Sequence, residues 1–166
     1  MKSIIEQHRQ DFNEIRRLCL ICHGLDLTSK SLFTDSTYDG RSTDTEIVLQ
    51  NMISGGLLNL AVALRINIYQ KKLTGYSDEN ISSCVFYYEE PDLISELITI
   101  KDVCDKIIHA DSVSLDALPK EITGDAKPCM QLKGTYRKKE WTLDISLELF
   151  TEAVLNFLDK LENEHT

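Results

Sequence analysis

Hydrophobic residues recur at steps of three or four positions in four segments of the chain, and this period predicts four amphipathic helices. The first segment covers residues 3–23, the second residues 43–73 and the third residues 91–110. The fourth begins after Ser146, whose hydroxyl can cap it. The chain is therefore expected to be mainly helical.

Local features set the expected ends of these helices. Gly24 is placed to end the first helix, and the polar residues 25–42 after it predict a long loop. Thr43 and Glu46 have the spacing of a capping box that begins the second helix. The pair Gly55–Gly56 interrupts that helix, so either the helix kinks there or another backbone packs close to it.

The hydrophobic period changes to two near the C-terminal end. Apolar and polar residues alternate on both sides of the charged segment Arg137–Glu140, which predicts a β-hairpin over residues 129–146. Residues 76–90 fit either a short strand or the end of a short helix, and residues 111–127 are expected to be mainly loop. Together these elements predict a mainly α fold: an up-down bundle of about four long helices with one β-hairpin inserted before the last helix, in a single domain over residues 1–166.

Composition and charge narrow the class of protein. The 166 residues include 18 Lys and Arg against 27 Asp and Glu, a net charge of −9, which argues against a protein that coats duplex DNA. No apolar run approaches the roughly 18–20 residues needed to cross a bilayer, and the charged start Met1–Arg9 does not resemble a signal peptide. We therefore expect a cytoplasmic protein that does not act at a membrane. Basic clusters such as Arg137–Lys139 leave room for a local anion site.

An odd number of cysteines, in a chain without an export signal, predicts reduced thiols rather than a disulfide framework. The five are Cys19, Cys22, Cys84, Cys104 and Cys129. Cys19, Cys22 and His23 have the form of a haem attachment site, but both cysteines lie on the apolar seam of the first helix and are better explained as small core residues. We therefore expect no cofactor and no metal at this segment.

Candidate chemistry gathers at the end of the third predicted helix. Asp105, Lys106 and His109 are spaced by three or four residues, so their side chains can meet on one helix face. The carboxylate of Asp105 would stabilise a His109 imidazolium and orient its ring. His109 could then move a proton near neutral pH, while Lys106 could hold a phosphate. The alternative is that His109 is only a structural feature of a helix end.

The segment Cys104–His109, with a long helix ending at Arg65 before it, resembles the HEPN superfamily, which includes RNA-cleaving toxins and defence proteins. The family's element is an Arg, a polar residue and a His a few residues further along. The resemblance implies a helical HEPN-like domain that pairs as a homodimer, in which the His assists attack by an RNA 2′-hydroxyl. This sequence departs from the family because its Arg is absent: positions 102 to 104 are Asp102, Val103 and Cys104.

Two functions follow from these observations. The first is a HEPN-like homodimer that acts by binding a protein or RNA, without catalysis. The second is a metal-independent endoribonuclease of a toxin or phage-defence type, with His109 as acid or base, supported by Asp105, and with Arg65 or Lys106 as the phosphate contact. An enzyme requires that Lys106, His109 and Arg65 converge in an exposed cleft, whereas the binding function predicts an exposed apolar patch with His109 facing elsewhere. A structural accessory protein is a third possibility, and the common phosphate-loop, dinucleotide, zinc-protease and serine-hydrolase motifs are missing.

Overall fold

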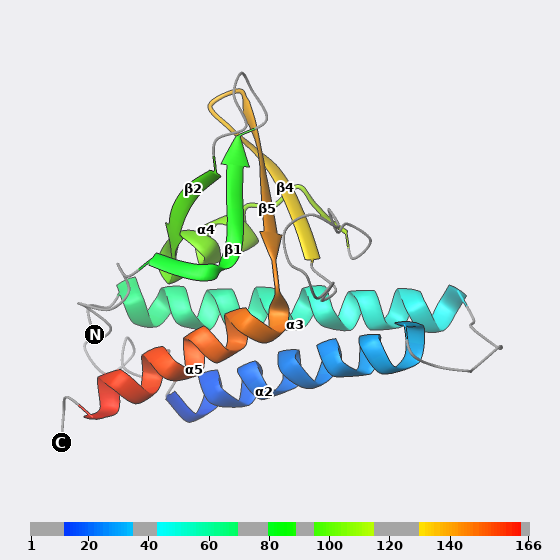
Figure 1. Ribbon diagram of the computed structural model, residues 1–166, viewed down its shortest axis with the longest axis horizontal. Helices are drawn as coiled ribbons and strands as arrows, with labels where there is room; N and C mark the ends of the chain where they lie inside the picture. Colours follow the sequence, from blue (N-terminus) through cyan, green and yellow to red (C-terminus); the bar gives the residue numbers. More distant parts are fainter. Residues whose placement is uncertain (1–11, 35–42, 70–79, 89–94, 115–129, 164–166) are drawn as a thin grey trace, which may run out of the picture.

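A five-stranded antiparallel sheet stands over three long helices in the computed structural model of the chain (Figure 1). The structure describes residues 12–34, 43–69, 80–88, 95–114 and 130–163. The helical elements are α2 (Phe12–Ser29), the π-helical turn η1 (Lys30–Thr34), α3 (Thr43–Tyr69), α4 (Ile100–Ile108) and α5 (Leu147–Asn163). The strands are β1 (Asn80–Tyr88), β2 (Ser95–Thr99), β3 (Ser112–Ser114), β4 (Met130–Tyr136) and β5 (Lys139–Ile145).

The sheet has the strand order β2-β1-β5-β4-β3, so β5 lies at its centre. The expected β-hairpin is present as β4 and β5, and Gly134 of β4 pairs with Trp141 of β5. On its other side β5 pairs with β1, where Tyr88 lies opposite Trp141. Residues 141–147 are all buried, because this strand has neighbours on both edges and leads directly into α5.

The three long helices pack on one another beneath the sheet, with α2 in contact with both α3 and α5. Gly56 of α3 allows a close approach, because a Cβ added there would lie 3.3 Å from the Sγ atom of Cys22 on α2. The helix continues through the glycine pair without a break, and close packing accounts for Gly56 but not for Gly55, where an added Cβ would meet nothing within 4 Å. Arg16 of α2 also reaches α5, where its guanidinium lies 2.9 Å from Asp159 and 2.8 Å from Glu162.

The predicted end of the first helix at Gly24 and the start of the loop 25–42 are wrong. Helix α2 continues to Ser29 and η1 follows it. One local and one distant contact of Lys30 explain this. The carboxylate of Asp26, buried to 6% exposure, accepts a hydrogen bond from Lys30 at 2.7 Å, one helical turn further along. Lys30 also donates to Glu148 of α5 at 2.9 Å.

The helix predicted over residues 91–110 is also wrong in its first half. Residues 95–99 form β2, and α4 begins only at Ile100. Thr99 has an extended backbone and closes a capping box with Asp102: the Thr99 hydroxyl accepts from the Asp102 N–H at 3.2 Å, and the Asp102 carboxylate accepts from the Thr99 N–H at 3.3 Å. Together these bonds fix the start of a short helix.

The predicted bundle is thus correct in part. The described residues contain four α-helices and the inserted hairpin, but α4 is short and the sheet takes in three further strands. The segment 76–90, which fitted either a strand or a helix, holds β1, and β3 lies within the predicted loop 111–127. The last helix begins after Ser146, whose side chain accepts from the N–H of Leu149 at 3.4 Å. The parts of these predictions outside the described residues are 3–11, 35–42, 70–73, 76–79, 89–94, 115–127 and residue 129.

Among the described helices, α3 is long and apolar enough to cross a membrane by length and composition, with a mean hydropathy of 1.7 in its most apolar window over Asp44–Tyr69. The prediction from the sequence was based on unbroken apolar runs and did not consider the mean hydropathy of this segment. The finding is weak evidence, since the core helix of a soluble protein passes the same test. In this structure α3 packs against α2 and α4, and Leu57, Leu60 and Leu64 are fully buried.

Adding one methyl group at Gly134 is expected to destabilise the fold. The Cβ atom of Gly134→Ala would overlap Cζ2 of Trp141, lie 2.7 Å from Cε2 and lie 3.1 Å from the carbonyl oxygen of His109. We expect the free energy of unfolding to fall by about 1–3 kcal/mol, measured by urea denaturation. The matched control is Gly55→Ala on α3, where an added Cβ meets nothing within 4 Å and should stabilise the helix by about 0.5–1 kcal/mol. A Gly134→Ala variant as stable as the control would contradict the prediction.

Asp144 makes stability depend on pH. Burial raises the pKa of this carboxyl above its usual value, against the hydrogen bond from Gln131 and the nearby Lys133, and its Oδ2 atom has no partner among the described residues. The pKa of this carboxyl is higher in the folded protein than in the unfolded chain. The contribution of Asp144 to the free energy of unfolding is therefore fully present below the unfolded pKa and is lost as pH rises through the folded pKa. Asp144→Asn should therefore be more stable than wild type at about pH 7, with the difference closing at about pH 3 in urea denaturation. An equal difference at both pH values would contradict the assignment to this carboxyl.

Candidate functional site

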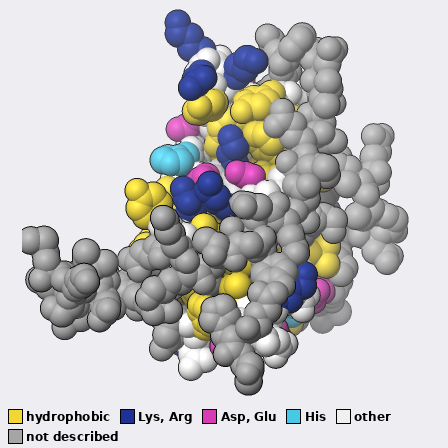
Figure 2. Space-filling view, turned by 90° about the vertical axis from the view of Figure 1, so that its left-hand side faces the viewer, with side chains coloured by type: hydrophobic (Ala, Val, Ile, Leu, Met, Phe, Trp, Pro, Cys, Tyr) yellow, Lys and Arg dark blue, Asp and Glu magenta, His cyan; other side chains and the backbone are white. Residues whose placement is uncertain are grey.

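An open cleft of about 810 Å³ lies where α3 and α4 meet the sheet. It is lined by Arg65, Tyr88, Asp102, Asp105, Lys106, His109, Asp111, Thr135, Tyr136 and Trp141. All four residues singled out from the sequence, Arg65, Asp105, Lys106 and His109, are in this set. Figure 2 shows one face of the molecule on which a histidine lies beside acidic, basic and hydrophobic side chains.

An ion pair between Arg65 and Asp105 joins α3 to α4 at the cleft. The guanidinium Nε of Arg65 lies 2.6 Å from Oδ1 of Asp105, and both side chains are partly exposed. The sequence analysis expected Asp105 to orient His109, but among the described residues its carboxylate bonds to Arg65 and not to the imidazole. Arg65 therefore contributes a cation whose charge is already balanced by Asp105.

Lys106 lies against an aromatic wall formed by the sheet. Its Nζ atom is 4.5 Å from the ring centroid of Phe86 and 4.8 Å from that of Trp141, and it is 5.7 Å from those of Tyr88 and Tyr136. Contacts of this kind between an ammonium group and ring faces are attractive. The aromatic wall thus fixes the position of the Lys106 charge within the cleft.

His109 is an exposed residue at the C-terminal end of α4. Its backbone N–H donates to the carbonyl of Asp105 at 3.1 Å, which makes it the C-cap of the helix. The imidazole is not sealed in the core, so this structure does not remove it as a candidate for chemistry. Its exposure leaves the ring open to a ligand in the cleft.

The tip of the β4–β5 hairpin extends the cleft with further cations. The guanidinium of Arg137 lies 5.2 Å from the ring centroid of Tyr136, and Nζ of Lys139 lies 5.9 Å from that of Tyr88. Arg137 and Lys138 form the turn itself with φ of 50° and 67°, values that favour Asn and Gly in a two-residue hairpin turn. Two basic residues therefore occupy a strained position next to exposed aromatic rings.

The lining of the cleft carries mixed charge. Asp102, Asp105 and Asp111 contribute three carboxylates, against the cations of Arg65 and Lys106. Such a lining can accept hydrogen bonds from amino groups and donate others. A bare phosphate would meet these three carboxylates in the cleft, whereas at the hairpin tip it would meet the side chains of Arg137, Lys138 and Lys139.

Cys19, Cys22, Cys84 and Cys104, the cysteines among the described residues, are buried and form no disulfide. Burial raises the pKa of Cys19 to about 12 and that of Cys22 to about 11, and it raises the pKa of Cys104 as well. Thiols with raised pKa values are poor nucleophiles and poor metal ligands at neutral pH. Cys104 also lies in the core, so it adds nothing to the cleft.

No protein-family model matches the chain, and searches of curated proteins and of solved structures found no match either. The HEPN resemblance therefore stays a prediction.

The sequence analysis missed the residues that the sheet and the start of α4 supply. Tyr136 was placed on the apolar side of the hairpin, yet 51% of its surface is exposed, and Tyr88 lay in a segment that fitted strand or helix. Asp102 was considered only as a substitute position for the missing Arg, although the Thr99-x-x-Asp102 spacing is itself a capping signal. Trp141 is only 2% exposed, and it nevertheless lines the cleft.

Relieving the strained hairpin turn should stabilise the protein. The double variant Arg137→Asn with Lys138→Gly places residues that favour positive φ at both turn positions. We expect a gain of about 1 kcal/mol, or roughly 2–4 °C in the melting temperature of a chain of this size, measured by thermal unfolding. Arg137→Ala with Lys138→Ala, which removes the same charges but keeps the strain, is the matched control. A double Asn-Gly variant with no gain over this control would show that the turn is not strained.

Proposed function

We propose that this protein binds single-stranded RNA, with a base in the cleft and the flanking phosphates at the tip of the β4–β5 hairpin. It acts by binding and does not need to cleave the strand. Single-stranded nucleic acids are bound by aromatic rings on which bases stack and by cations that follow the backbone. The cleft and the hairpin tip offer both within one continuous surface.

The observation that supports this proposal best is the alternation of cations and aromatic rings. Lys106, Arg137 and Lys139 each lie within 6 Å of the ring centroid of Tyr88 or Tyr136. The half-exposed ring of Tyr136 is flanked by Lys106 and Arg137, an arrangement in which a base can stack on the ring while the guanidinium contacts the neighbouring phosphate. The strained conformation of the turn residues agrees with a role beyond joining two strands.

The mixed charge of the cleft favours a base rather than a phosphate beside His109. Asp102 and Asp111 line the cleft with His109, and carboxylates accept hydrogen bonds from exocyclic amino groups of bases. A phosphate in the same place would be repelled by them. This is why binding, and not cleavage, is the function we propose first.

The second candidate is a metal-independent endoribonuclease that uses His109. It is supported by the convergence of Arg65, Lys106 and His109 in one exposed cleft, the condition set for an enzyme from the sequence. It requires that Arg65 exchange its partner Asp105 for phosphate, because this ion pair holds Nε at 2.6 Å. The binding experiment described below therefore includes a measurement of RNA cleavage.

The homodimer and the cytoplasmic location expected from the sequence remain part of the proposal. Exposed apolar side chains on α3 support a contact with a second copy: Val48, Met52, Leu58 and Val62 are 56%, 52%, 43% and 38% exposed. They alternate with the buried stripe of the same helix.

Binding to a fluorescently labelled single-stranded RNA, followed by anisotropy, tests the proposal. Tyr136→Ala should weaken binding about tenfold, since a stacked base contributes roughly 1–3 kcal/mol. The Arg137→Ala, Lys138→Ala variant should bind more weakly and show a shallower dependence on salt. The control is Arg17→Ala, which removes a cation of α2 that pairs with Glu14, away from the cleft.

Three outcomes separate the candidates. Equal affinity in wild type, Tyr136→Ala and Arg17→Ala would refute RNA binding at this surface. Stronger binding to duplex than to single-stranded RNA would contradict the stacking role of Tyr136. Cleavage of the RNA in the presence of a chelator, lost in His109→Ala while that variant still binds, would replace the binding function by the nuclease.

A further inference from the structure

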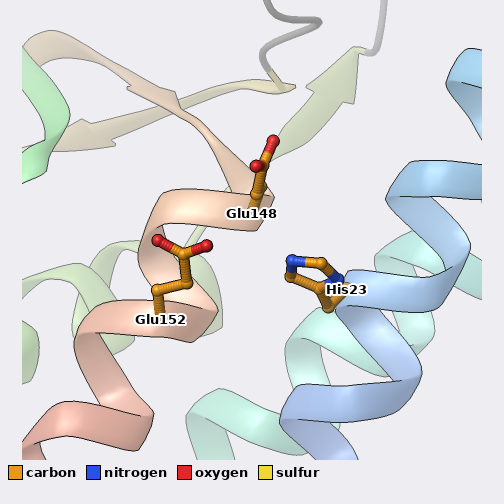
Figure 3. Close-up of side chains that lie close together, drawn as sticks. All are labelled: His23, Glu148 and Glu152. Atoms are coloured by element: carbon orange, nitrogen blue, oxygen red, sulfur yellow. The ribbon is translucent and has the colours of Figure 1, made fainter.

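A second group of chemically active side chains lies between α2 and α5 and shares no residue with the cleft. His23 of α2 faces Glu148 and Glu152 of α5, and Figure 3 shows the imidazole pointing toward the gap between the two carboxylates. One ligand atom from each of the three side chains lies within 4.8 Å of the others. From this convergence we infer a binding site for a divalent first-row transition metal, held by one imidazole nitrogen and two carboxylate oxygens.

The ligand set and the spacing fit such an ion. Metals of this class bind nitrogen and oxygen ligands at about 2.0–2.2 Å, so ligand atoms already within 4.8 Å of one another need only small side-chain rotations to close around it. Glu148 and Glu152 are one helical turn apart on α5, which places both carboxylates on the face turned toward His23. A mixture of imidazole and carboxylate suits Mn²⁺, Fe²⁺, Co²⁺ or Zn²⁺ better than a purely oxygen-preferring ion.

The side chains around the group support the same assignment. Lys30 holds Oε2 of Glu148 at 2.9 Å and Asp26 at 2.7 Å, and a carboxylate that ligates a metal is commonly fixed by such a neighbouring donor. With neutral His23, the charges of Asp26, Lys30, Glu148 and Glu152 sum to −2. A divalent cation would balance this charge.

The scaffold of the site is rigid and separate from the thiols. Helices α2 and α5 pack on each other and are tied further along by the ion pairs of Arg16 with Asp159 and Glu162. Cys22, the neighbour of His23 in sequence, is buried in the core. His23 therefore takes part in a metal site of a different kind from the one that its Cys-x-x-Cys-His sequence suggests.

Titration of the untagged full chain with Co²⁺ tests the site, because the absorption of bound Co²⁺ distinguishes thiolate ligands from nitrogen and oxygen ligands. We expect one Co²⁺ per chain without thiolate bands, displaced by Zn²⁺. His23→Ala and Glu152→Gln should each weaken binding at least about tenfold. The matched control is Glu162→Gln, the same change on the same helix, about 15 Å along it from Glu152.

The test remains decisive even if one of the variants does not fold. Glu152 is exposed, so Glu152→Gln should keep the fold even if His23→Ala does not, which circular dichroism will show. Equal affinity in wild type, Glu152→Gln and Glu162→Gln would overturn the site. So would thiolate bands, or the absence of saturable binding by wild type.

Discussion

The contact between the indole of Trp141 and the backbone of Gly134 is the interaction on which the cleft depends. The two residues face each other across β4 and β5, and only a residue without a Cβ atom leaves room for the ring. With its ring in that place, Trp141 lies 4.8 Å from the ammonium of Lys106, and a Cβ added at Gly134 would also lie 3.1 Å from the carbonyl oxygen of His109. Trp141 therefore packs in the core, with 2% of its surface exposed, and also lines the cleft.

Charge is distributed unevenly in this acidic chain. With a net charge of −9, the protein as a whole repels polyanions, and an attractive surface must be built locally. At the hairpin tip, cations lie close to aromatic rings and are attracted to the ring faces. This gathers positive charge at one place on an acidic protein. In contrast, cations of α2 and η1 are paired within the fold: Arg16 of α2 pairs with Asp159 and Glu162, and Lys30 of η1 with Asp26 and Glu148. Basic residues thus hold helices together in the α2–α5 region, whereas at the hairpin tip they lie beside aromatic rings.

Elements with a strong local pattern were predictable from the sequence, while those fixed by distant contacts were not. The hairpin and the last helix follow from alternation and from Ser146, and α3 from its long apolar stripe. The continuation of α2 past Gly24 depends on Lys30 reaching Glu148, far along the chain, which no local pattern reveals. Strand β2 was lost because its apolar residues continue the period of α4. Arg65, Asp105, Lys106 and His109 were found by residue type and spacing, but the exchange of partner at Asp105 and the aromatic wall around Lys106 required the order of the strands.

The strand order also determines when the cleft can exist during synthesis. Arg65, Tyr88 and Lys106 leave the ribosome well before Trp141, the residue against which the wall is built. Strand β1 meanwhile has β2 as a partner, but its other edge must wait for β5. Pairing across such a separation in sequence is slow compared with the formation of helices. The nascent chain therefore keeps this edge of β1 unpaired until β5 has emerged, and the cleft can form only after that.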